Sequence, residues 1–248
     1  MNKEKELVDI NELPPEVQAL LDEAAKVQSE SELSTIPFMS LKGKKFSIGD
    51  EKFGSSLNCI ILADVHDYSW YDRPYDPDIQ SPPACFAIGK IQDDMAPHED
   101  SPKKQHESCY DCPKNQFASA PNGKGKACRN GRRLLVASLT DNRANFGDLA
   151  IINMSPTALK GFSKYMKNIS TVKRLPIWSV ITNLSFDEDS DYPLLTANFV
   201  SVANAIDIGT IASRMAEFQD MVSIPYDVSN YEAPEAAAAT SAKKSKMS

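Results

Sequence analysis

The stretch "RRLLVASLTDNRANFGDLAIINMS", residues 132–155, indicates the fold class of the chain, because it holds two apolar segments around one polar turn. Residues 132–140 and 148–155 are rich in Leu, Ile, Val and Ala, as buried strands are. The linker between them, residues 141–147, is polar and contains Asp, Asn and Gly, which favour a hairpin. We therefore expect two antiparallel strands here.

Further segments on both sides of this hairpin have strand-like composition, with Ile, Val and aromatic residues between Gly, Pro and Asp. They are residues 44–54, 57–72, 83–90, 176–189 and 192–202. Two helices are expected, one over residues 155–170, which begin with Ser-Pro, and one over residues 206–222. Many strands followed by strands interleaved with helices favour an α+β fold. We expect a small β-barrel or a curved antiparallel sheet, with an inserted loop and two packing helices.

The chain is expected to have one main domain between two extensions. Residues 1–35 form an N-terminal helical extension, with an amphipathic helix over residues 13–28 and a polar linker after it. Residues 36–223 form the main domain, in which an inserted loop covers about residues 85–133. Residues 224–248 are rich in Ala and poor in core-forming residues, so we expect a disordered tail that contacts another protein.

Composition and charge limit the classes of protein to consider. No window reaches ~18 consecutive apolar residues, so no transmembrane helix and no membrane partner are expected. The N-terminus lacks the apolar region of a signal peptide, which favours a cytoplasmic location and reduced cysteines. The net charge is −7, yet eight basic and only two acidic residues lie between Lys103 and Arg133. This asymmetry indicates a specific anionic partner.

Three cysteines in this basic region have the spacing of a zinc site. Cys109 and Cys112 form a Cys-x-x-Cys pair, and Cys128 follows a flexible Gly-Lys-rich loop that can fold back to them. A redox Cys-x-x-Cys is less favoured, because such motifs normally open a helix in a βαβ unit and this one lies in a loop rich in Pro, Gly and Lys. We expect a structural zinc ion, since no general base accompanies the thiols.

The fourth ligand of a tetrahedral zinc site has three candidates: Cys85, His106 and His98. Cys85 is preferred, because four thiolates form a self-consistent closed site, although its apolar neighbours also fit a core thiol. His106 lies close in sequence and is the main alternative, while His98 is the weakest. Cys59 stands in the apolar run "LNCIILADV" and is expected to be a core thiol.

The second informative stretch is "DYSWYDRPYD", residues 67–76, where aromatic residues surround an arginine. Exposed aromatic rings beside Arg stack on the bases of a single strand. Strand alternation places Tyr68 and Trp70 on one face and Tyr71 on the other, so part of the cluster belongs to the core. The predicted nucleic-acid contacts are Trp70, Tyr71, Arg73 and Tyr75, together with the basic residues Lys124, Lys126, Arg129, Arg132 and Arg133. The alternative for the basic block is a solvated loop whose lysines aid solubility.

Two stretches resemble a family of phage-encoded zinc-containing proteins. They are "SPPACFAIGK … ESCYDCPKNQFASAPNGKGKACRNGRRLLV" and "SPTALKGFSKYMKNI … LPIWSVITNLSFD", and the resemblance covers roughly residues 36–220. In that family pattern Cys85 belongs with the other three cysteines. The organisation is similar to that of phage single-stranded-DNA-binding proteins, which use an OB-type barrel, sometimes with zinc. The resemblance implies that residues 36–223 form an OB-like small β-barrel with a zinc loop over about residues 85–133. It also implies single-stranded DNA binding in phage DNA replication or recombination.

Two other classes of function are weaker alternatives. A metal-dependent nuclease is suggested by the acidic residues Asp64, Asp67, Asp72, Asp76 and Asp78 with His66, but no motif fixes two carboxylates on one rigid element. A protein-binding regulator of a host or phage polymerase is the second, with replication or transcription proteins as partners of the tail. We therefore expect a binding protein that is not an enzyme.

Overall fold

The computed structural model describes residues 14, 17–18, 36–74 and 81–233. The chain divides into two units, Met1–Ile36 and Pro37–Ser248, and each is described by itself. In the first unit Val17 and Gln18 are helical, and the rest of the helix expected over residues 13–28 lies almost entirely outside the described residues.

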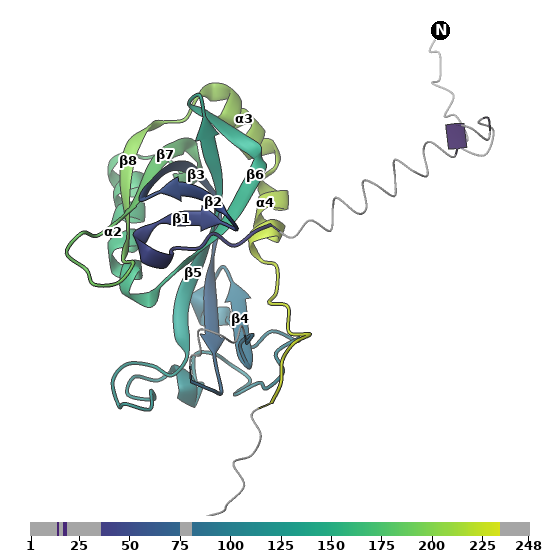
Figure 1. Cartoon of the computed structure of the whole chain (residues 1–248), viewed down its shortest axis with the longest axis vertical. Coiled ribbons are helices and arrows are strands. Elements are labelled where there is room, and N and C mark those ends of the chain that lie inside the picture. Colours follow the sequence, from purple (N-terminus) through teal and green to yellow (C-terminus); the bar gives the residue numbers. More distant parts are fainter. Residues whose placement is uncertain (1–13, 15–16, 19–35, 75–80, 234–248) are drawn as a thin grey trace, which may run out of the picture. The chain divides into compact units, whose positions relative to one another are not determined.

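An antiparallel sheet organises the second unit (Figure 1). Its six strands are β3 (Ser56–Trp70), β4 (Cys85–Gly89), β5 (Arg129–Thr140), β6 (Arg143–Met154), β7 (Val180–Phe186) and β8 (Leu195–Val202). The strand order is β6-β5-β3-β7-β8, and β4 pairs with β3. A separate hairpin joins β1 (Phe46–Ile48) to β2 (Glu51–Gly54). The expected α+β class with an antiparallel sheet is confirmed; among the described strands β6 and β8 do not pair, so no closed barrel forms.

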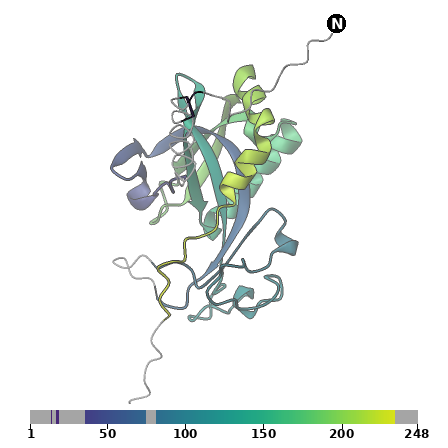
Figure 2. The same cartoon turned by 90° about the vertical axis from the view of Figure 1, so that its right-hand side faces the viewer.

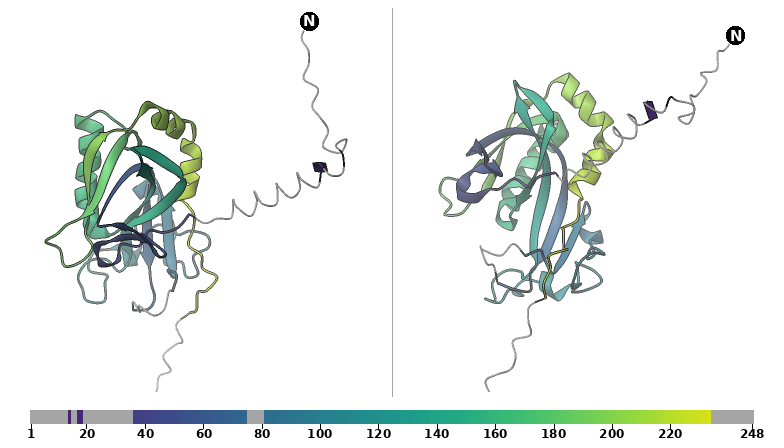
Figure 3. Two further views of the ribbon diagram at one scale, coloured as in Figure 1. Left: turned by 45° about the horizontal axis from the view of Figure 1, so that its top comes forward. Right: turned by 45° about the vertical axis from the view of Figure 1, so that its right-hand side comes forward.

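Strand β3 is the centre of this sheet. It pairs with β5 from Cys59 to Ser69, while β7 lies beside its first residues and β4 beside its last five. A register shift between Ile61 and Ala63 marks a bulge, which bends a strand. The bend of β3 is visible in Figure 3. The C-terminal end of β3 and the N-terminal end of β5 extend together with β4 beyond the other strands, at the bottom of Figure 1.

The hairpin that joins β5 to β6 is tighter than the sequence suggests. Asp141 and Asn142 have φ values of 50° and 60°, which is typical of a two-residue type I′ turn. The predicted linker over residues 141–147 is therefore too long, because strand pairing resumes at Arg143. Strand β5 also begins at Arg129, three residues before the expected start, so Arg129 and Arg132 are strand residues rather than loop residues.

Three α-helices are described in the second unit. α2 (Leu159–Lys167) follows a 3-10 turn, Pro156–Ala158, and continues into a π turn, Asn168–Val172. The helix expected over residues 206–222 is two helices, α3 (Ala205–Ser213) and α4 (Met215–Val222), because Arg214 leaves helical geometry with φ −110° and ψ 15°. The remaining 3-10 turns are Lys42–Lys44, Gln92–Asp94, Pro113–Asn115 and Ile177–Ser179. None of the described helices is long and apolar enough to cross a membrane.

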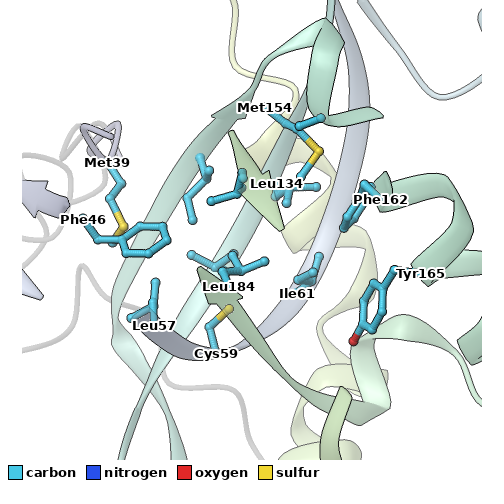
Figure 4. Close-up of a cluster of buried hydrophobic side chains, with 14 of the residues drawn as sticks. Met39, Phe46, Leu57, Cys59, Ile61, Leu134, Met154, Phe162, Tyr165 and Leu184 are labelled. Atoms are coloured by element: carbon cyan, nitrogen blue, oxygen red, sulfur yellow. The ribbon is translucent and has the colours of Figure 1, made fainter. Parts of the chain in front are cut away.

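The sheet buries side chains on both faces. Phe46, Leu57, Ile61, Leu134 and Leu184 belong to a cluster that α2 closes with Phe162 (Figure 4). Cys59 is fully buried in the same cluster, which confirms it as a core thiol. Along β3 and β5, the residues that alternate with the members of this cluster lie outside it. α4 crosses these two strands on the opposite face of the sheet (Figure 2).

The segment Ile224–Tyr231, here called the C-terminal strap, follows α4 and returns along the strands (Figure 2). Tyr226 donates a hydrogen bond of 2.7 Å to Asp67, and its ring meets the Phe86 ring edge-on at 5.1 Å. Tyr231 donates a hydrogen bond of 2.6 Å to Asp72. The disorder expected from residue 224 onwards is therefore wrong for the strap, because two tyrosines anchor a segment that is otherwise poor in core residues. Residues 234–248 lie outside the described part of the chain.

Candidate functional site

Four cysteines line one small cavity. Cys85 stands at the start of β4, Cys109 and Cys112 lie in the loop of residues 90–128, here called the cysteine loop, and Cys128 directly precedes β5. The cavity has a volume of about 20 Å³, which is room for about one water-sized particle. The structure thus brings together the four residues that the sequence selected as metal ligands.

The two histidines considered as alternative ligands lie elsewhere. His106 Nδ1 is 3.1 Å from the Ser108 carbonyl oxygen in its own turn, and His98 Nδ1 is 3.5 Å from Asp100. Neither histidine lines the cysteine cavity. The positions therefore favour Cys85 over both histidines as the fourth member of the cluster.

Hydrogen bonds between loop segments bring the cysteines together. The Cys109 N–H donates to the Met95 carbonyl at 2.9 Å, and the Cys128 N–H donates to the Lys114 carbonyl at 2.7 Å. The buried Asn115 side chain donates to the Cys109 carbonyl at 2.6 Å and accepts from Lys126 Nζ at 3.1 Å. Asn115 therefore ties the Cys-x-x-Cys turn to the basic part of the loop.

The thiols influence one another electrostatically. Burial, and next the repulsion from neighbouring cysteines, raises the pKa of Cys109 and the pKa of Cys128 to about 12. Burial also raises the pKa of Cys85. In the part of the chain that the structure describes, no three Cys, His, Asp or Glu side chains are arranged so that they could hold a metal ion. The sulfurs therefore share a cavity without the geometry of a closed coordination sphere.

Aromatic residues form the wall of the cavity. Tyr68 and Trp70 extend into it from β3, as the alternation along that strand predicts. Trp70 is half-buried, and Lys103 Nζ and Lys114 Nζ lie 5.9 and 5.3 Å from the centre of its ring. The predicted contact between Trp70 and a base therefore competes with two cation–π contacts inside the protein.

Arg133 does not lie at the surface. Its side chain is fully buried on the face of β5 that α4 and the strap cover, where its Nε is 3.3 Å from an Asp67 carboxylate oxygen. Its Nη1 donates to the Ile224 carbonyl, and its guanidinium carbon is 4.3 Å from the centre of the Tyr226 ring. The prediction that Arg133 contacts nucleic acid is wrong, because strand alternation turns this arginine inward while Arg132 points the other way.

The remaining basic residues keep access to solvent to different degrees. Lys124, Lys126 and Arg129 are exposed. Arg132 is half-buried, with Nη1 2.8 Å from Asp64 and Nη2 3.2 Å from His66 Nε2. Burial, and next the Arg132 guanidinium, lowers the pKa of His66, so the neutral ring can accept a hydrogen bond from Arg132.

The aromatic stretch over residues 67–76 is only partly available. Tyr71 is 41% exposed and follows Trp70, so it lies on the opposite face from the cysteine cavity. Arg73 has its Nε 4.0 Å from Asp72, and its Nε and Nη2 are buried without a hydrogen-bond partner among the described residues. Tyr75 lies outside the described residues. The structure therefore does not bring these predicted stacking residues to one described surface.

Two exposed aromatic residues in the cysteine loop were not selected from the sequence. Of the aromatic side chains described, Phe117 and Tyr110 are the most exposed, at 79% and 68%. Both stand in "CYDCPKNQF", beside the cysteines and within a loop where no strand can bury them. Tyr110 lines a polar cavity of about 270 Å³ with Lys126 and Gln116, and Asn115 and Tyr68 separate this cavity from the cysteines.

The three described carboxylates among those considered for a nuclease each have a partner of their own. Asp64 pairs with Arg132, Asp67 pairs with Arg133, and Asp72 accepts from Tyr231. Asp76 and Asp78 lie outside the described residues. No observation on the described part of the chain favours a two-carboxylate site.

Comparison with protein families, with curated proteins and with solved structures finds no match for the chain. The resemblance carried by the cysteine motif gains no support from these comparisons. The function must therefore be inferred from the residues and their geometry.

Proposed function

We propose that the protein binds single-stranded DNA at the surface formed by the cysteine loop. The observation that carries this proposal is the position of Tyr110 and Phe117. These two rings, the most exposed among the described aromatic residues, stand in the loop that holds the exposed Lys124 and Lys126. Rings that stack on bases, next to cations that attract phosphates, are the two components of sequence-tolerant single-strand binding.

The strand order supports this proposal. An OB-type domain is built on a Greek key, in which the first strand lies between the second and the fourth and a long connection joins the third strand to the fourth. The order β6-β5-β3-β7-β8, with α2 between β6 and β7, has this arrangement if β3 is the first strand. The cysteine loop then belongs to the connection between the first two strands, which commonly contacts oligonucleotides in OB-type domains.

The four cysteines would serve this surface by holding a zinc ion. Four thiols around a cavity of about 20 Å³, with neither candidate histidine among its lining residues, fit a structural zinc site in the composition of the donor set. The side chains or the loop would have to move to bring the sulfurs to bonding distance, because the described residues do not form a closed coordination sphere. A bound cation would offset the repulsion between thiolates and would fix the loop that carries Tyr110 and Phe117. A role in phage DNA replication or recombination is consistent with such binding.

The proposal is tested by measuring the affinity of the zinc-supplemented protein for a labelled oligo-dT strand and for a duplex of the same length. We expect the single strand to bind more tightly, because only unpaired bases can stack on the rings. We also expect the affinity to fall with salt, since phosphate contacts release counterions. Equal affinity for the two DNAs, or no binding to either at low salt, would contradict single-strand binding.

A further inference from the structure

The polar cavity beside Tyr110 is large enough for one base of a nucleic acid. Its volume is about 270 Å³, which is roughly twenty times the space that one water molecule needs. The exposed Tyr110 ring belongs to its lining, and a base that enters the cavity can stack on that ring. The groups around the cavity then determine which base fits.

Two side chains of the lining provide free hydrogen-bond acceptors. Asp111 is exposed, and its carboxylate forms no ion pair or hydrogen bond with another described residue. Gln116 donates through Nε2 to the Tyr110 carbonyl at 2.9 Å, which leaves its Oε1 without a described partner. A free carboxylate repels a phosphate group and accepts hydrogen bonds from a base, so this cavity favours a base over the backbone of the strand.

Lys126 provides the donors of the same cavity. Its Nζ donates to Oδ1 of the buried Asn115 at 3.1 Å, and Asn115 in turn donates to the Cys109 carbonyl at 2.6 Å. This chain of contacts fixes the position of the ammonium group. An ammonium group has three donors, so two remain for a ligand.

Guanine is the base whose edges match a carboxylate and an ammonium group together. Its N1–H and N2 amino group are neighbouring donors that can pair with the two oxygens of one carboxylate. Its O6 and N7 atoms are acceptors, to which lysine donates in specific nucleic-acid contacts. The other three bases of DNA do not present two neighbouring donor atoms on one edge.

We propose that this cavity holds one guanine of the bound single strand, with Asp111 accepting from N1–H and the N2 amino group and Lys126 donating to O6. This inference rests on the proposed function, because it adds a preferred base to a surface that otherwise tolerates any sequence. The second free donor of Lys126 remains for a phosphate contact.

The first test measures the affinity of the zinc-supplemented protein for oligo-dT strands that carry one central guanine, hypoxanthine or adenine. Hypoxanthine differs from guanine only in lacking the N2 amino group, so it keeps one of the two bonds to Asp111. We expect the guanine strand to bind at least about fivefold more tightly than the other two, which is the effect of one well-formed base contact. Equal affinity for the guanine and hypoxanthine strands would overturn the proposal.

The second test repeats these titrations with Asp111→Asn. The amide replaces one acceptor oxygen by a donor, so the preference for guanine over hypoxanthine should be largely lost. The affinity for plain oligo-dT should stay equal or rise, because a negative charge is removed. The matched control is Asp141→Asn, since Asp141 is an exposed acid of the β5–β6 turn that does not line the cavity.

A guanine preference that survives Asp111→Asn, or that disappears equally in Asp141→Asn, would contradict the assignment to Asp111. The two levels of the account can be told apart. If the wild-type protein binds no single strand at all, the proposed function fails; if it binds oligo-dT and does not select guanine, only the guanine site fails.

Discussion

At the scale of single residues, the pair of Arg133 and Asp67 shows what composition cannot reveal. Both residues are buried, and Tyr226 completes the contact by donating to the carboxylate. Burial, and next the Asp67 charge, raises the pKa of Tyr226, so its phenol stays protonated and remains a donor. In the sequence Arg133 looks like one more member of the basic block, whereas in the fold it holds the strap to the sheet.

Replacement of Arg133 by methionine is expected to lower the free energy of unfolding by about 3 kcal/mol, because the Asp67 carboxylate then stays buried without its cation. Urea unfolding followed by tryptophan fluorescence measures this change. The control is the double variant Arg133→Met/Asp67→Asn, which removes both charges and keeps an acceptor for Tyr226, and whose stability should lie closer to the wild type. A single variant within 1 kcal/mol of the wild type would show that the pair is not a stabilising contact.

The oligo-dT affinity of folded Arg133→Met should equal that of the wild type, since the side chain does not reach the surface. This expectation separates Arg133 from Lys124, Lys126 and Arg129, which remain predicted phosphate contacts.

At the scale of structural elements, the strap is the feature that was not predicted from the sequence. Its composition is poor in apolar residues, yet Tyr226 meets Phe86 and Tyr231 reaches Asp72. We expect a chain that ends after Ser223 to have a markedly lower melting temperature, because it loses these contacts and uncovers Arg133. A chain that ends after Ala233 should keep both the melting temperature and the oligo-dT affinity of the full chain. Similar melting temperatures for the two truncations would contradict an anchoring role of the strap.

The cysteine loop gives the second prediction at this scale. We expect one zinc ion per chain by elemental analysis of freshly purified, unchelated protein, and a loss of that zinc in Cys109→Ser and Cys85→Ser. Cys59→Ala is the matched control, because Cys59 is buried in the core cluster and should leave the zinc content unchanged. If Cys85→Ser keeps a full zinc content and His106→Ala loses zinc, the fourth ligand is the histidine. Wild-type protein without stoichiometric metal would contradict the zinc proposal as a whole.

Several elements could be predicted from the sequence because their signals are local. Apolar runs located β3, β5, β6, β7 and β8, and the Cys-x-x-Cys spacing selected residues that gather around one cavity. Features that depend on distant partners could not be predicted. The pairing of Arg133 with Asp67 and the anchoring of Tyr226 each depend on contacts between segments far apart in the chain.

At the scale of the whole second unit, the cysteine cavity and the polar cavity beside Tyr110 share structural parts. Tyr68 lines both cavities, and Asn115 connects Cys109 to Lys126. Any change that loosens the cysteine loop should therefore also displace the wall of the polar cavity beside Tyr110. In this account the cysteines stabilise a surface, and the surface binds the strand.

The measurement that tests this account most directly compares oligo-dT binding by Tyr110→Ala/Phe117→Ala with binding by Tyr71→Ala. Tyr71 is also an exposed tyrosine, but it lies on the opposite face from the cysteine cavity. Two lost stacking contacts of roughly 1–3 kcal/mol each should weaken binding by the double variant at least about thirtyfold, while Tyr71→Ala binds as the wild type does. Undiminished binding by the folded double variant, or a larger loss in Tyr71→Ala, would contradict a nucleic-acid surface on the cysteine loop.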